Sequence, residues 1–146
     1  MNIKEKLLRK NTKKAFTLVE LVIVISILAI LAAIAIPVIT TTINSSKLSV
    51  MESDSATVEM MLKEALTAYK SDIENVEYNG NSPDTATVED VLIENNIDLN
   101  IMSMRKIGGV DYAIYWNNAI EGTVLISGSG ITEFDLTTQI SDLGTL

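Results

Sequence analysis

The chain of 146 residues contains no cysteine and no histidine. Without cysteine it has neither a disulfide framework nor a thiolate metal site. Without histidine it lacks the commonest general base and the commonest metal ligand of proteins. These absences argue against an enzyme, and we expect no catalytic residue, no metal and no cofactor. If the protein is exported, the absence of cysteine is also compatible with a Gram-positive source.

Basic residues are scarce beyond the first fifteen positions. Of the 11 Lys and Arg residues six lie in residues 1–15, whereas only one of the 19 acidic residues lies there. Residues 16–146 therefore keep five basic and eighteen acidic residues, a formal net charge of −13. Because phosphate binding needs clustered Lys and Arg, we expect no non-specific binding of nucleic acid. The acidic surplus is typical of a solvated surface.

A long apolar run follows the basic block. Residues 18–39 contain one charged side chain, Glu20, and one other polar side chain, Ser26. As a helix these 22 residues extend about 33 Å, enough to cross a hydrocarbon core of about 30 Å. Because basic flanks stay in the cytoplasm, we expect a single-pass protein of the cytoplasmic membrane, with its N-terminus inside and the later residues outside.

Ordinary membrane signals do not require a charge at Glu20. A cleaved secretory signal has a shorter apolar core, usually about 7 to 15 residues, and a plain signal anchor needs no acidic residue. Thr17 and Glu20 also fit a capping box, in which the carboxylate bonds back to a free amide at the helix start. Glu20 alone therefore leaves two roles open, a helix cap and a functional charge.

The wider stretch favours a functional charge. Residues 13–20 read KKAFTLVE. A basic leader, a small residue, Phe-Thr-Leu-x-Glu and an apolar helix together resemble the class III signal of type IV pilins and related pseudopilins. The resemblance is strong over about residues 10–45 and only architectural beyond them. Ala15 stands where the family usually has glycine, and the fifteen-residue leader is longer than many.

The resemblance implies a processing route and a set of partners. A membrane prepilin peptidase would cut between Ala15 and Phe16 and then methylate the new amine of Phe16. In a filament the carboxylate of Glu20 would meet the Phe16 amine of a neighbouring copy, which compensates a buried charge and sets the axial register. The implied partners are copies of the chain itself, an assembly platform protein and an assembly ATPase.

Pro37 lies deep in the apolar run, where pilins often have a proline. It has no amide hydrogen and its ring clashes with the carbonyl of Ala33, which predicts a kink or a locally opened helix. One interpretation is a simple membrane-helix kink. The resemblance adds another, a segment that unwinds when the subunit leaves the bilayer. The expected assembly residues are therefore Phe16, Glu20 and Pro37.

Helical periodicity continues beyond the apolar run. Apolar side chains recur mostly at three- and four-residue steps, at Leu48, Met51, Val58, Met61, Leu62, Ala65, Leu66 and Tyr69. We expect one helix over about residues 16–70, apolar all round in its first half and amphipathic in its second. A polar loop at 79–84 and a short helix at about 87–95 follow.

The last third of the chain predicts strands at 110–116, 123–127 and 131–136. The predicted fold class is α+β, a long N-terminal helix packed under a small antiparallel sheet, as in pilins. The predicted divisions are a cleaved leader at 1–15, a membrane and filament-core helix at 16–46, and a globular head at 47–146.

Two groups of head side chains have alternative uses. Alternation places Tyr112 and Trp116 on one strand face and Tyr115 on the other, which favours core packing over an adhesive aromatic patch. No Asp/Asn-rich calcium loop is present, so a solvated surface is favoured over a calcium site for the paired and C-terminal acids. These acids are Glu89, Asp90, Glu133, Asp135 and Asp142.

Three functions are compatible with these patterns. The favoured one is a structural subunit of a type IV pilus, a surface filament for adhesion, motility or biofilm formation. The second is a pseudopilin of a type II secretion or competence system. The third is a membrane-anchored exported domain with an unrelated activity.

Overall fold

The structure is a computed structural model that describes residues 16–73 and 75–144. The chain divides into two compact units, Met1–Thr40 and Thr41–Leu146. The finer division into leader, filament-core helix and head stays a prediction.

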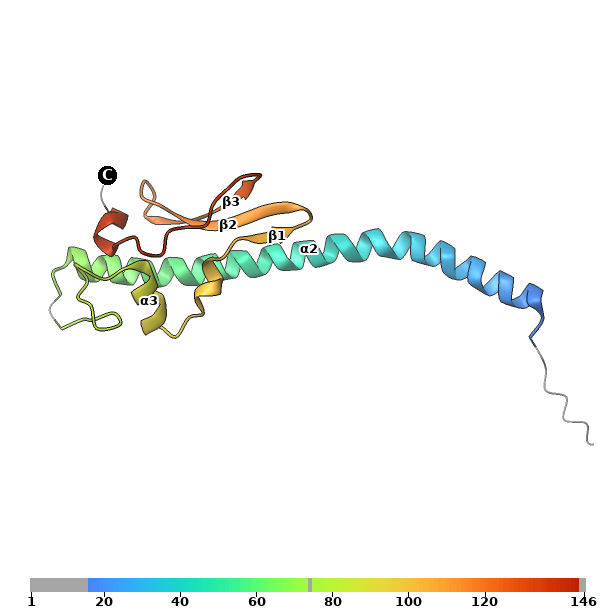
Figure 1. Ribbon diagram of the computed structural model, residues 1–146, viewed down its shortest axis with the longest axis horizontal. Coiled ribbons are helices and arrows are strands. Elements are labelled where there is room, and N and C mark those ends of the chain that lie inside the picture. The colour runs from blue at the N-terminus through green and yellow to red at the C-terminus, as the bar shows by residue number, and fades with distance from the viewer. Residues whose placement is uncertain (1–15, 74, 145–146) are drawn as a thin grey trace, which may run out of the picture. The chain divides into compact units, whose positions relative to one another are not determined.

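The predicted long helix is confirmed as α2, which spans the 53 residues Leu18–Lys70 (Figure 1). No glycine interrupts it, and Pro37 is its only proline. The helix ends where Asp72 adopts a left-handed backbone conformation, with φ of 49°, because such a residue cannot continue a right-handed helix. The amide of Ile73 then bonds the carbonyl of Ala68 at 3.2 Å, which closes the helix end.

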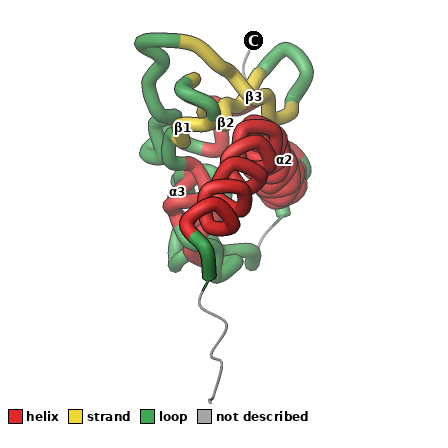
Figure 2. The backbone as a smooth tube through the Cα atoms, turned by 90° about the vertical axis from the view of Figure 1, so that its right-hand side faces the viewer, coloured by secondary structure: helices red, strands yellow, loops and turns green. Residues whose placement is uncertain are grey.

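Within the second unit, α2 buries one face. The buried side chains recur at three- and four-residue steps over most of this stretch and comprise Met51, Ser55, Val58, Leu62, Ala65, Leu66 and Ala68. All of them except Ser55 and Ala68 join one hydrophobic core with side chains of the sheet and of the short helix α3, Val88–Glu94. Figures 1 and 2 show the sheet along one side of this helical segment and α3 on another side. The apolar face of α2 thus packs against the sheet and α3.

The sheet has three antiparallel strands in the order β1-β2-β3, with bounds Arg105–Ile107, Val110–Asn117 and Gly122–Gly128. Ile107 pairs with Val110 across a two-residue turn in which Gly108 and Gly109 have φ of 59° and 87°. Positive φ at both central residues matches the twist of a tight hairpin and favours glycine at both. The α+β fold class is therefore confirmed.

The predicted third strand at 131–136 is wrong. These residues form loop and turn, and the third strand is β1, which precedes the two predicted strands. The side chain of Asp135 accepts bonds from the amide and the hydroxyl of Thr137 at 3.0 and 2.7 Å. Such local side-chain bonds turn the backbone and compete with a strand ladder.

The C-terminal segment packs on the head by other contacts. The carbonyls of Leu136 and Thr138 accept the amides of Glu89 and Val88, each at 3.0 Å. The short helix η2, Ile140–Gly144, buries Leu143, whose carbonyl accepts the indole N–H of Trp116 at 2.9 Å. Residues 136–144 therefore complete the core instead of extending the sheet.

Candidate processing and assembly segment

The start of α2 is capped by Thr17. Its hydroxyl oxygen accepts the backbone amide of Glu20 at 3.2 Å, and its carbonyl accepts the amide of Leu21 at 3.2 Å. The first bond satisfies an amide that has no backbone partner at the helix start, and the second is the first regular bond of the helix. The first half of the predicted capping box is therefore present.

The carboxylate half of that box is absent among the described residues. Glu20 is exposed, and within residues 16–73 and 75–144 its carboxylate makes no hydrogen bond or ion pair. The complete box at α3 offers a direct comparison, because there Thr87 accepts the amide of Asp90 while the Asp90 carboxylate accepts the amide of Thr87 at 3.0 Å. Capping therefore accounts for Thr17 but leaves the Glu20 carboxylate open for another partner.

Phe16 directly precedes the capped helix start. It is the first described residue, and its side chain is 79% exposed. Ala15, the predicted cleavage position, lies outside the described residues. Within the part of the chain that the structure describes, Phe16 and Glu20 are thus both exposed, and both expected assembly residues are uncovered.

Among the described residues of its unit, nothing covers the apolar run. Every residue over 18–39 is exposed, and α2 contains the one stretch in the described chain that is long and apolar enough to cross a membrane. Large apolar side chains here, such as Ile30, Ile34 and Ile36, are 63 to 65% exposed. Contiguous apolar surface of this extent is a mark of a lipid-facing or protein-facing segment.

Pro37 lies inside α2, and the helix continues through it. The hydroxyl of Thr40 bonds back to the carbonyl of Ile36 at 2.9 Å, and the hydroxyl of Ser26 bonds back to Val22 at 2.7 Å. These bonds satisfy polar side chains without any partner outside the helix, which suits an apolar environment. The helix opening expected at Pro37 stays a prediction.

The aromatic side chains of β2 follow the predicted alternation. Trp116 is buried in the core and Tyr112 packs against it, whereas Tyr115 faces away. The Tyr115 ring meets Phe134 edge to face, with centroids 5.7 Å apart, and its hydroxyl donates to the Thr132 carbonyl at 2.8 Å. Core packing is thus confirmed for Tyr112 and Trp116. Tyr115 instead contacts residues 131–136, the segment that was wrongly predicted as a strand.

The acidic residues considered for calcium have individual roles in the head. Hydrogen bonds from Asn79 and Thr87 hold the pKa of Asp90 below its ordinary value, although burial, the largest single effect, acts to raise it. The carboxylate of Glu133 accepts the amide of Met104 at 2.9 Å. Among the described residues, no three acidic side chains gather closely enough to hold a metal ion.

Comparison with known proteins yields one match. Residues 10–36 match the family model described as the prokaryotic N-terminal methylation motif. No curated protein and no solved structure matches the chain. The match includes the helix start with Phe16, Thr17 and Glu20 and ends just before Pro37. Residues 10–36 of this chain therefore form a prokaryotic N-terminal methylation motif, the class III signal peptide of type IV pilins.

Proposed function

We propose that the chain is a prepilin that becomes a structural subunit of a type IV pilus. The observation that carries the proposal is the methylation motif at residues 10–36, which runs into an exposed apolar helix and is followed by a packed α+β head. In this account the protein first resides in the cytoplasmic membrane with residues 1–15 in the cytoplasm. A prepilin peptidase cuts between Ala15 and Phe16 and methylates the Phe16 amine.

Glu20 directs assembly in this account. An isolated carboxylate is costly in an apolar environment, and pairing with a cation lowers that cost. Glu20 has no such cation among the described residues, so its partner is the methylated amine of Phe16 in a neighbouring copy. Methylation keeps the positive charge of that amine, and the pair fixes the axial position of each added subunit.

The apolar helix over 18–39 passes from the bilayer to the filament core. Its exposed side chains exchange lipid contacts for contacts with helices of other copies. This exchange supplies little hydrophobic driving force, because lipid tails are as apolar as leucine. The assembly platform protein and an assembly ATPase therefore provide the work of extraction. At Pro37 the helix has one fewer internal hydrogen bond, so opening the helix there during the transfer costs less free energy than at other positions.

Filament purification from the native host tests this function and separates it from the pseudopilin alternative. Surface appendages are sheared from cells, sedimented and imaged by electron microscopy after labelling with an antibody against the head. A pilus subunit predicts labelled filaments in the sheared fraction. A processed chain that remains in the cell envelope would instead identify a pseudopilin of a secretion or competence system, and an unprocessed chain would contradict both.

A further inference from the structure

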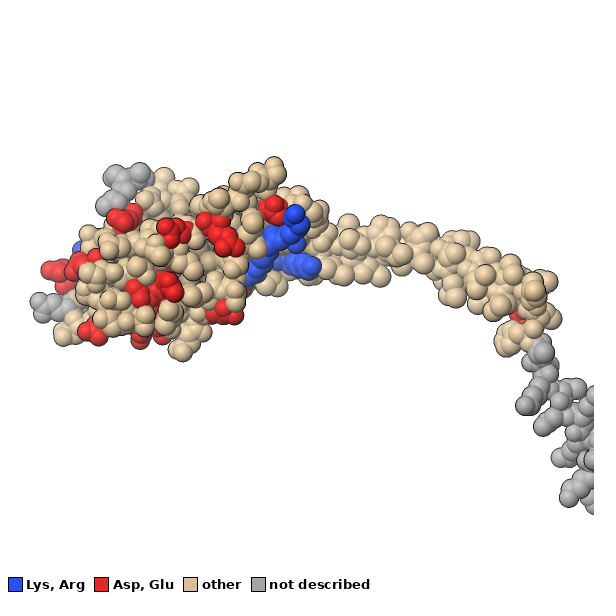
Figure 3. Space-filling view, in the orientation of Figure 1, with Lys and Arg blue, Asp and Glu red and all other residues tan. Residues whose placement is uncertain are grey.

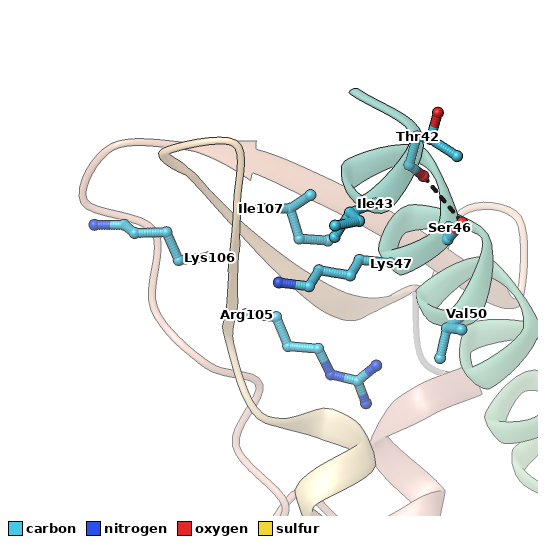
Figure 4. A pocket seen from close by; sticks show the side chains of 8 residues that line it. All are labelled: Thr42, Ile43, Ser46, Lys47, Val50, Arg105, Lys106 and Ile107. Carbon is cyan, nitrogen blue, oxygen red and sulfur yellow. Dashed lines mark hydrogen bonds between the residues drawn. The ribbon is translucent and has the colours of Figure 1, made fainter. Parts of the chain in front are cut away.

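A groove with a basic rim lies within the second unit, between α2 and β1. Its volume is about 530 Å³, and its floor is formed by Ile43, Val50 and Ile107. In Figure 4 the side chains of Ile43 and Ile107 point toward one another, and Lys47 reaches from α2 toward β1. Ile43 and Val50 are 48% and 55% exposed, so the apolar floor is open to an external partner. We call this feature the basic groove.

Positive charge gathers around the basic groove. Lys47, Arg105 and Lys106 line it, and they are three of the five basic residues in 16–146. Figure 3 shows basic side chains gathered mainly in one area of the visible face, whereas acidic side chains are spread over the rest of the head. A cationic area on a head with eighteen acidic residues indicates a partner that is itself anionic.

The three cations differ in how far the head itself compensates them. Arg105 forms an ion pair with Asp54 at 2.6 Å. Lys106 is 67% exposed and lies 3.5 Å from Asp111, a loose surface pair of small energy. The ammonium group of Lys47 makes no ion pair or hydrogen bond within residues 16–73 and 75–144. The ammonium groups of Lys47 and Lys106 are therefore available to an external anion.

Chain connectivity places Lys47 near the bilayer surface while the span is inserted. Lys47 follows Ile39, the last residue of the apolar run, by eight residues. Eight residues extend about 12 Å as a helix and at most about 28 Å when fully extended. The headgroup layer adds about 5 to 8 Å to each side of the hydrocarbon core, and charges act over a Debye length of about 8 Å. A helical connection thus brings Lys47 within electrostatic reach of lipid phosphates.

We propose that the basic groove docks the head on the surface of an anionic phospholipid bilayer before assembly. The ammonium groups of Lys47 and Lys106 meet lipid phosphates, and the half-exposed Ile43, which follows Ile39 by only four residues or about 6 Å of helix, lies among the headgroups. The acidic remainder of the head is repelled by the same surface, so the docked head has one preferred orientation. This inference rests on the membrane-anchored stage of the proposed function.

Energy transfer in reconstituted vesicles tests the docking. The chain has no cysteine, so Val110→Cys supplies a unique attachment point for a fluorophore. Val110 is 42% exposed and pairs with Ile107 at the hairpin beside the groove. The labelled full-length protein is inserted into vesicles of phosphatidylcholine alone or with phosphatidylglycerol, and each contains a lipid with an acceptor dye on its headgroup. We expect higher transfer efficiency in the anionic vesicles and a decline of that difference at high salt.

Charge variants make the test specific to the groove. Lys47→Gln with Lys106→Gln should lower the ratio of docked to undocked heads about fivefold per lysine removed. The matched control, Lys63→Gln with Lys70→Gln, removes the same charge from α2 outside the groove and should leave the ratio unchanged. The buried Trp116 reports in both variants, through its emission, that the head is folded.

Three results would overturn the docking. Equal energy-transfer efficiency in neutral and anionic vesicles would show that anionic phospholipid is not the partner of the groove. If the control variant lost as much docking as the groove variant, the docking would depend on the net charge of the head and not on the groove. Transfer that rises with the number of proteins per vesicle would identify a second copy of the chain as the occupant. Flotation of the protein with neutral vesicles is measured first. If the protein does not float with them, the membrane anchor of the proposed function is contradicted, whereas a protein that floats but does not dock contradicts only the docking.

Discussion

The carboxylate of Glu59 on α2 accepts both the backbone amide and the hydroxyl of Thr123 on β3, each at 3.0 Å. Lys63, one turn further along the helix, donates to the same carboxylate at 2.6 Å. The carbonyl of Ser55 also lies 3.0 Å from the Thr123 hydroxyl and is an alternative acceptor for its single proton. Because β3 lies at an edge of the sheet, its outward amide has no strand partner, and Glu59 supplies the acceptor. One carboxylate therefore ties the sheet edge to the helix.

We predict that Glu59→Gln lowers the free energy of unfolding of the head by about 1 kcal/mol at neutral pH, since a charged acceptor is replaced by a neutral one. The hydrogen bond from Lys63, followed by that from the Thr123 amide, holds the pKa of Glu59 below its ordinary value. Its ionised form therefore stabilises the head above about pH 4.5, and this contribution is lost as the pH falls through the lower pKa of the folded state.

Thermal unfolding followed by Trp116 emission measures this effect from pH 7 to pH 3. The difference in melting temperature between wild type and Glu59→Gln should be largest near pH 7 and shrink below about pH 4.5. Glu52→Gln, on an exposed position of the same helix, is the matched control and should leave the melting temperature unchanged. A gap that stays constant with pH would contradict the role of the ionised carboxylate.

The bond from Trp116 to Leu143 should hold the C-terminal segment in place. Trp116→Phe keeps an aromatic ring in the core but leaves the carbonyl of Leu143 without its donor, which costs about 1 to 3 kcal/mol. We expect faster proteolysis within η2 than in the wild-type protein, measured by mass spectrometry of limited digests. Tyr112→Phe, which removes a hydroxyl from a partly buried neighbour, is the control. Equal digestion rates in all three proteins would show that the indole bond is not what retains the segment.

The sequence predicted well the elements that depend on local pattern. The period of apolar residues located α2, and the short helix expected at about 87–95 is confirmed as α3. The strand β1 was missed because its three residues, Arg105 to Ile107, include two charges and show no alternation. The signal that identifies it is the Gly108-Gly109 pair between Ile107 and Val110, a recognised two-residue hairpin turn.

The mistaken strand at 131–136 has a different cause. Its apolar and acidic residues alternate, but alternation cannot distinguish a strand from a loop whose side chains bond locally. Asp135 turns the backbone through a local bond from Thr137, and Phe134 packs on Tyr115, a contact that depends on the tertiary structure. The basic groove likewise joins Lys47 to residues almost sixty positions later, so no local pattern predicted it.

Removal of the charge at Glu20 should affect assembly more than processing. Glu20→Ala keeps the capping hydroxyl of Thr17 and the expected cleavage site between Ala15 and Phe16, but it removes the proposed partner of the Phe16 amine. We expect normal leader removal and a loss of surface filaments of tenfold or more, measured by immunoblots of sheared and cell-bound fractions. Glu52→Ala, a charge loss on the head, is the control. Wild-type amounts of filament in Glu20→Ala would disprove the pairing role.

Substitution at Ala15 should affect processing first. A peptidase that accepts a small residue here would tolerate Ala15→Gly and reject the long, charged side chain of Ala15→Lys. We expect the lysine variant to keep its leader, remain in the membrane fraction and form no filaments, as judged from intact protein mass. Filaments built from leader-bearing subunits would contradict the requirement for cleavage.

Mass spectrometry of the N-terminal peptide, on protein sheared from the cell surface, tests the central claim most directly. We predict a peptide that begins at Phe16 and carries one methyl group on its α-amine. Such a peptide would show that the same molecule was both processed and exported. Methylated Phe16 found only in membranes would support the predicted processing but contradict assembly into a surface filament. A terminus at Met1 would contradict the account, since the methylation motif would then have no product.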